Sequence, residues 1–94
     1  MVIGVFSFNR YTATNFILSI MENYGSIDRI EKGDGVFNVF FESGCIISWI
    51  PPGCTAKQIK VYKAYVDKLL MKDKEYIKYI KAALPYGEKK FIKF

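Results

Sequence analysis

Lysine residues crowd the second half of this chain, and their charge is the clearest chemistry that the sequence offers. Residues 1–54 hold three basic and five acidic residues, a net charge of −2, whereas residues 55–94 hold eleven lysines and four acids, a net charge of +7. Such asymmetry is typical of proteins that meet a polyanion or an acidic surface. We therefore expect nucleic acid or an acidic protein surface as the partner of the second half.

Five of these lysines are candidate nucleic-acid-binding residues, because they lie mostly off the apolar positions of a predicted helical stretch. Tyrosines interleave with them, so the surface could follow phosphates by charge and add stacking. The alternative is a solvated helix face, since lysine is a common surface residue. No membrane partner is expected, because the apolar face is needed for the core. The candidates are Lys57, Lys60, Lys74, Lys78 and Lys81.

Enzymatic chemistry finds little support in the remaining residues. The chain has no histidine, which removes the usual general base and the commonest metal ligand. Its two cysteines, Cys45 and Cys54, are nine residues apart and have no ligand cluster beside them, so a zinc site is not expected. We predict a protein that is not an enzyme and uses no cofactor or metal.

The elements that must position these side chains begin with a short apolar run. Val2–Phe8 is predicted to be a buried strand, and it lacks the basic region of a signal peptide. Thr12 and Thr14 are N-cap candidates for a helix over about 15–24, which Gly25 would end. Three further strands are expected over 27–32, 36–42 and 45–50.

Apolar residues then recur at three- and four-residue steps from Ile59 to Leu84, which predicts helix over 55–84. A break is expected at 72–75, where Asp73 would cap a second helix. Phe91–Phe94 is either an edge strand or a loose tail.

This element order predicts a single α+β domain over 1–94, with an antiparallel sheet and both helices packed on one face. Residues 1–54 would supply the sheet and first helix, and residues 55–94 a basic helical half. A ferredoxin-like variant fits as an analogy of element order.

The central hairpin supplies a second candidate site. If Ser43-Gly44 is a two-residue loop, Phe40 and Trp49 fall on one sheet face, with Arg29 opposite Phe40. Three interpretations stay open: a surface that stacks unpaired bases, the centre of a homodimer interface, or a second small core under the C-terminal helices. The candidate residues are Arg29, Asn38, Phe40 and Trp49.

We therefore expect a small cytoplasmic binding protein that contacts nucleic acid through its basic C-terminal helices. The alternative is a protein-interaction module, an inhibitor or regulator that docks an acidic surface of a larger partner. No segment approaches the roughly 20 apolar residues of a membrane span. The composition, rich in Ile, Lys, Phe and Tyr, is typical of AT-rich genomes and favours a phage or viral accessory protein.

Overall fold

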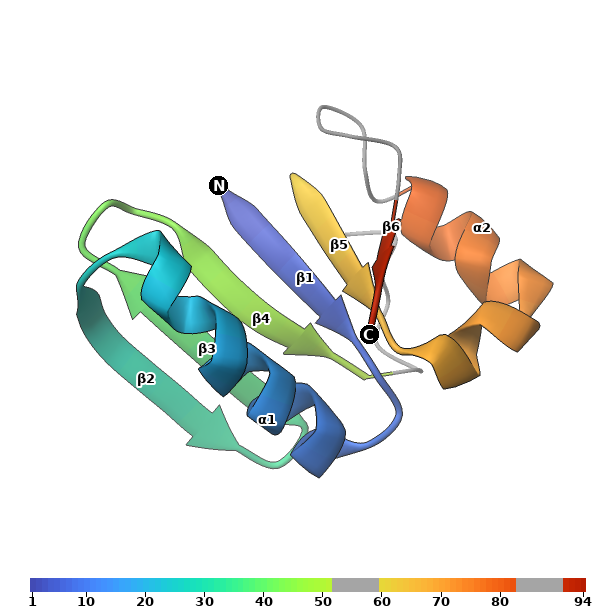
Figure 1. The fold of residues 1–94 in the computed structure, drawn as a ribbon, viewed down its shortest axis with the longest axis horizontal. Helices are drawn as coiled ribbons and strands as arrows, with labels where there is room; N and C mark the ends of the chain where they lie inside the picture. The colour runs from blue at the N-terminus through green and yellow to red at the C-terminus, as the bar shows by residue number, and fades with distance from the viewer. Residues whose placement is uncertain (52–59, 83–90) are drawn as a thin grey trace.

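A computed structural model describes residues 1–51, 60–82 and 91–94, with the side chain of Phe91 left out. Within these ranges the chain forms a small α+β domain built on a mixed sheet of six strands with two α-helices (Figure 1). The elements in chain order are β1 (Val2–Phe6), α1 (Arg10–Ile20), the 3₁₀-helix η1 (Met21–Tyr24), β2 (Ile27–Gly33), β3 (Val36–Phe41), β4 (Ile46–Ile50), β5 (Lys63–Val66), the 3₁₀-helix η3 (Lys68–Lys72), α2 (Lys74–Ala82) and β6 (Phe91–Lys93).

The six strands lie in the order β2-β3-β4-β1-β5-β6. The pairs β2–β3 and β3–β4 are antiparallel, whereas β1 runs parallel to both β4 and β5, and β5 runs parallel to β6. The expected antiparallel sheet and its ferredoxin-like variant are therefore wrong. Strand β1 lies in the middle of the sheet between β4 and β5, which come much later in the chain. Element order alone does not predict such parallel pairing between strands that are distant in sequence.

The two helices pack on opposite faces of the sheet, so the prediction that both cover one face is also wrong. Successive residues of a central strand point to opposite faces, and both faces of β1 are buried. The α1-side core is Ile3, Val5, Ala13, Ile17, Phe37, Val39, Phe41, Cys45, Ile47, Trp49 and Tyr65. The α2-side core is Phe6, Ile50, Val61, Ala64, Val66, Leu70 and Ile80.

Helix α1 begins five residues before the predicted start. The side chain of Asn9 caps it, because its Oδ1 accepts from the backbone N–H of Tyr11 at 2.8 Å and of Thr12 at 3.3 Å. Thr12 and Thr14 therefore lie inside the helix and are not its cap. The predicted end is closer, since η1 continues to Tyr24 and Gly25 follows with a φ of 93°.

The predicted helix over 55–84 is interrupted within the described residues by strand β5. Ala64, Tyr65 and Val66 are all buried, since a central strand covered on both faces has a continuous apolar run. The predicted break is confirmed, because Asp73 Oδ1 accepts from the N–H of Tyr76 at 3.1 Å at the start of α2. Residues 55–59 and 83–84 of the prediction lie outside the described residues.

The edge-strand alternative for the C-terminus is confirmed by β6, which pairs parallel to β5. Phe94 continues this contact, because its N–H donates to Val66 O at 3.0 Å and its ring stacks on Phe16 with centroids 4.0 Å apart. The basic half of the chain thus contributes β5 and β6 to the sheet, rather than helices alone.

Candidate functional site: a lysine-bearing helix face and an open sheet face

The loop between β3 and β4 sets which side chains share a face. Phe41 N–H donates to Cys45 O at 2.9 Å, and Gly44 N–H donates to Phe41 O at 3.0 Å. The loop therefore has three residues, Glu42 to Gly44, and Gly44 adopts a φ of 92° that favours glycine. The predicted two-residue loop is wrong, and the true register is shifted by one residue.

This shift moves Trp49 to the other face of the sheet from Phe40. Phe40 pairs with Ile46, and Val39 pairs with Ile47. Because a one-residue slip exchanges the two faces of a strand, Trp49 joins the α1-side core, where it is 8% exposed. Its indole Nε1 donates to Ser7 O at 2.9 Å. The expectation that Trp49 and Phe40 form one exposed aromatic pair is wrong.

The rest of the predicted set does come together on what we call the open face. Arg29 pairs with Phe40, as predicted, and Glu31 pairs with Asn38. The Arg29 guanidinium lies 4.1 Å from the centroid of the Phe40 ring, within the range of a cation–π contact. Phe40, Asn38 and their neighbours on β4, Ile46 and Ser48, remain partly exposed and line a shallow hollow of about 390 Å³.

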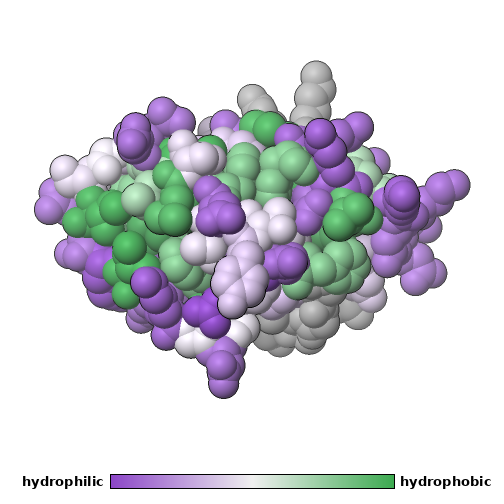
Figure 2. All heavy atoms as spheres, turned by 60° about the horizontal axis from the view of Figure 1, so that its bottom comes forward, coloured by the Kyte–Doolittle hydropathy of each residue, from purple (hydrophilic) through white to green (hydrophobic). Residues whose placement is uncertain are grey.

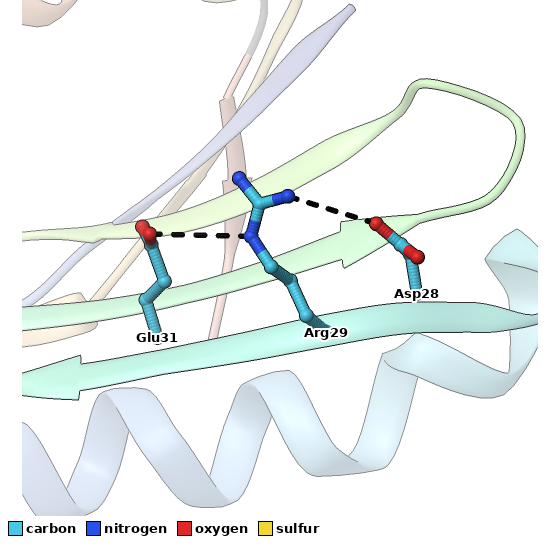
Figure 3. A network of polar contacts seen from close by, with 3 residues as sticks. All are labelled: Asp28, Arg29 and Glu31. Carbon is cyan, nitrogen blue, oxygen red and sulfur yellow. Dashed lines mark ion pairs between the residues drawn. The ribbon is translucent and has the colours of Figure 1, made fainter.

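Two carboxylates offset the charge of Arg29 on this face. Its Nη1 lies 3.7 Å from Asp28 Oδ2, and its Nε lies 4.0 Å from Glu31 Oε2 (Figure 3). The register of β2 against β3 shifts between Ile27 and Arg29, and this bulge brings Asp28 beside Arg29. The local charge of the three residues is therefore negative, which disfavours a nucleic-acid backbone at the open face.

Three of the five candidate lysines share one face of α2, which we call the lysine face. Lys74, Lys78 and Lys81 recur at steps of four and three residues, so they fall within an arc of about 60°. All three are exposed, whereas Ile80 on the other side of the helix is fully buried. Lys60 is also exposed but lies on the segment before β5, and Lys57 lies outside the described residues.

Other groups around α2 extend this basic surface. Lys68 and Lys72 of η3 are exposed beside the start of α2, although the candidate set did not include them. Glu75, Lys78, Tyr79 and Ala82 line a hollow of about 430 Å³, and Tyr79 is 44% exposed. Figure 2 shows hydrophilic groups projecting from the end of the molecule that holds η3 and α2 in Figure 1.

A buried polar pair that the sequence did not predict joins the ends of β1 and β5. Ser7 Oγ donates to Asp67 Oδ2 at 2.8 Å, and Asp67 Oδ1 accepts from the N–H of Leu69 at 3.0 Å. Both residues are buried. Because they are 60 positions apart in the chain, no local spacing signal connects them. With every carboxylate oxygen occupied by a donor, the pair serves as a structural tie.

Cys45 lies within the described residues and is buried in the α1-side core, whereas Cys54 lies outside them. Burial raises the pKa of its thiol above the ordinary value of 9.0. In the described ranges, no group of three or more potential metal ligands is present. The described helices include none with the length and hydrophobicity needed to cross a bilayer.

Comparison with known proteins adds no family to this geometry. No family model, curated protein sequence or solved structure matches the chain.

Proposed function

We propose that this chain is a small non-enzymatic protein that binds nucleic acid through the lysine face of α2. The observation that carries the proposal is the placement of Lys74, Lys78 and Lys81 on one exposed arc of a helix. Along the helix axis these residues are separated by about 6 Å and about 4.5 Å, so their ammonium groups can follow neighbouring phosphates.

The chemistry of this surface favours contact without base selection. Lysine presents a compact point charge and lacks the planar fork with which arginine reads guanine. Tyr79 lies beside Lys78 with 44% of its surface exposed, and its ring offers a platform for an unpaired base. Single-stranded nucleic acid is the ligand that combines phosphates with accessible bases, so it is the preferred probe.

Titration of a fluorescent single-stranded oligonucleotide tests this proposal. We expect binding by the wild type at low salt and a marked loss of affinity in Lys78→Glu. The matched control is Lys63→Glu, which makes the same charge change on the α1 side of the sheet, where Lys63 lies near the Tyr65 ring. Equal loss of affinity in both variants would mean that only the net charge of the protein matters, and it would contradict binding through the lysine face.

The second candidate is a protein-interaction module, an inhibitor or regulator that docks an acidic protein surface. Leu69 supports it, because this large apolar side chain is 65% exposed and lies between Lys68 and Lys72 on η3. A large exposed apolar side chain with charged residues beside it is common at protein interfaces. Leu69→Ser separates the candidates: it should weaken capture of a protein partner from nuclease-treated lysate and leave oligonucleotide affinity unchanged.

A further inference from the structure

Strand β2 forms one edge of the sheet and offers an unpaired ladder. It is seven residues long, every one of its residues is exposed, and among the described strands it pairs with β3 alone. The opposite edge, β6, has three residues. A long edge strand is a template for pairing with another chain unless its side chains prevent this.

The backbone groups of β2 that point away from β3 can be assigned from the hairpin. Phe41 N–H donates to Cys45 O, so the backbone groups of Phe41 point toward β4. Since these directions alternate along a strand, Phe40 points toward β2 and its partner Arg29 points back toward β3. The N–H and C=O of Ile30 therefore point outward, at the centre of the edge.

The charges of β2 are complementary to those of the same strand read in reverse. The sequence from Asp28 to Lys32 carries charges −, +, 0, −, +. In an antiparallel pair centred on Ile30, Arg29 stands opposite Glu31 of the second copy, and Lys32 follows on the side of Asp28, which lies at the bulge before Arg29. Opposite charges at facing positions stabilise a strand pair, whereas like charges destabilise it.

This complementarity is lost when the register slips by one or two residues. A slip by one residue removes both Arg29–Glu31 contacts and exchanges the faces of the incoming strand, whereas a slip by two residues places Arg29 opposite Arg29 or Glu31 opposite Glu31. The Arg29 side chain lies over the Phe40 ring but is 59% exposed, and its ion pairs with Asp28 and Glu31 are 3.7 and 4.0 Å long, so its exposed nitrogens can meet a carboxylate of the second copy.

We propose that a second copy of this chain pairs with β2 in antiparallel register centred on Ile30, joining two sheets edge to edge. The interface is isologous, because each copy contributes the same strand. The outward groups of Ile30 match those of Ile30 in the second copy, and two Arg29–Glu31 contacts flank the two-fold axis. This proposal does not depend on nucleic-acid binding, since α2 does not contribute to the β2 edge.

Charge reversal followed by mixing tests the proposal by sedimentation velocity over a range of protein concentrations. The wild type is expected to form a dimer. Arg29→Glu alone places carboxylates opposite carboxylates at both contacts, and Glu31→Arg alone places guanidinium groups opposite each other. Each variant should dimerise only at a protein concentration about tenfold or more above that of the wild type.

An equimolar mixture of the two variants should recover the dimer, because both contacts in the mixed pair are then attractive. Circular dichroism of each variant establishes that it is folded. Ile30→Pro should also weaken the dimer, since it removes the outward N–H of Ile30 without changing any charge. A wild type that stays monomeric at all concentrations, or a dimer that neither charge reversal weakens, would overturn the proposal.

Discussion

Ser7 and Asp67 are joined by a buried hydrogen bond of 2.8 Å from Ser7 Oγ to Asp67 Oδ2, across 60 positions of the chain. Ser7 follows β1 and Asp67 follows β5, and the N–H of Asp67 also donates to Phe6 O at 2.9 Å. The chain leaves β1 toward α1 on one face and leaves β5 toward η3 and α2 on the other. The pair therefore fixes the point at which the two layers of helix diverge.

Ser7→Ala should destabilise the fold by about 1–3 kcal/mol, because it leaves a buried carboxylate oxygen without its donor. Urea unfolding followed by circular dichroism measures this loss. Ser19→Ala is the matched control, since Ser19 is exposed and its hydroxyl donates to Phe16 O within the same helix. Equal losses in the two variants would contradict a special role for the buried pair.

The position of Trp49 predicts a protected fluorophore. Its side chain is 8% exposed, and it is the only tryptophan in the chain. Its emission should therefore resist quenching by iodide in the folded protein and become accessible only on unfolding in urea. Strong quenching of the folded protein would place Trp49 back on the open face beside Phe40.

Gly4→Ala should destabilise the protein by about 1–3 kcal/mol through overpacking of the α2-side core. A Cβ at this position would lie 2.7 Å from the Phe6 ring and 3.1 Å from side-chain atoms of Ile50 and Val61. Gly33→Ala is the control, because its nearest atom would be 3.8 Å away. Thermal unfolding of both variants compares them, and a smaller loss for Gly4→Ala would refute this packing.

Stability should fall as the pH rises above 10.0, the ordinary pKa of tyrosine. Burial, together with a hydrogen bond of 3.3 Å to the Tyr65 hydroxyl, raises the pKa of Tyr24 above 10.0. The folded state then binds this proton more tightly than the unfolded state, so the stabilisation is complete below pH 10.0 and is lost above it.

Tyr24→Phe should make the free energy of unfolding less sensitive to pH in this alkaline range. The burial of Cys45 acts in the same direction from its ordinary value of 9.0, so the comparison is made in a Cys45→Ala background. Urea titrations at a series of pH values supply the measurement. An unchanged pH dependence in Tyr24→Phe would exclude Tyr24 as the responsible group.

Local signals predicted much of the N-terminal half. The predicted pairing of Arg29 with Phe40 is confirmed, because the turn between Gly33 and Val36 is short and the strands pair regularly from Val36 to Phe40. The next turn was harder, since Ser43-Gly44 fits a two-residue loop and the actual loop also includes Glu42. That single residue was enough to move Trp49 from the open face to the core.

The C-terminal half shows the limit of periodicity. Tyr62, Val66 and Leu69 satisfy helical spacing, yet Val66 ends a strand buried on both faces. A short apolar run cannot be assigned to strand or helix by spacing alone. Asp73 was predictable because its side chain acts locally, whereas the Ser7–Asp67 pair depends on the parallel pairing of β1 with β5.

The salt dependence of oligonucleotide binding tests the proposed function most directly. Affinity for a fluorescent single-stranded oligonucleotide is measured at several salt concentrations for the wild type and for Lys74→Gln/Lys78→Gln. If both lysines neutralise phosphates, the slope of log affinity against log salt should become shallower by about 0.7 for each lysine. A wild type that does not bind at the lowest salt, or a slope that the double substitution leaves unchanged, would contradict nucleic-acid binding through α2.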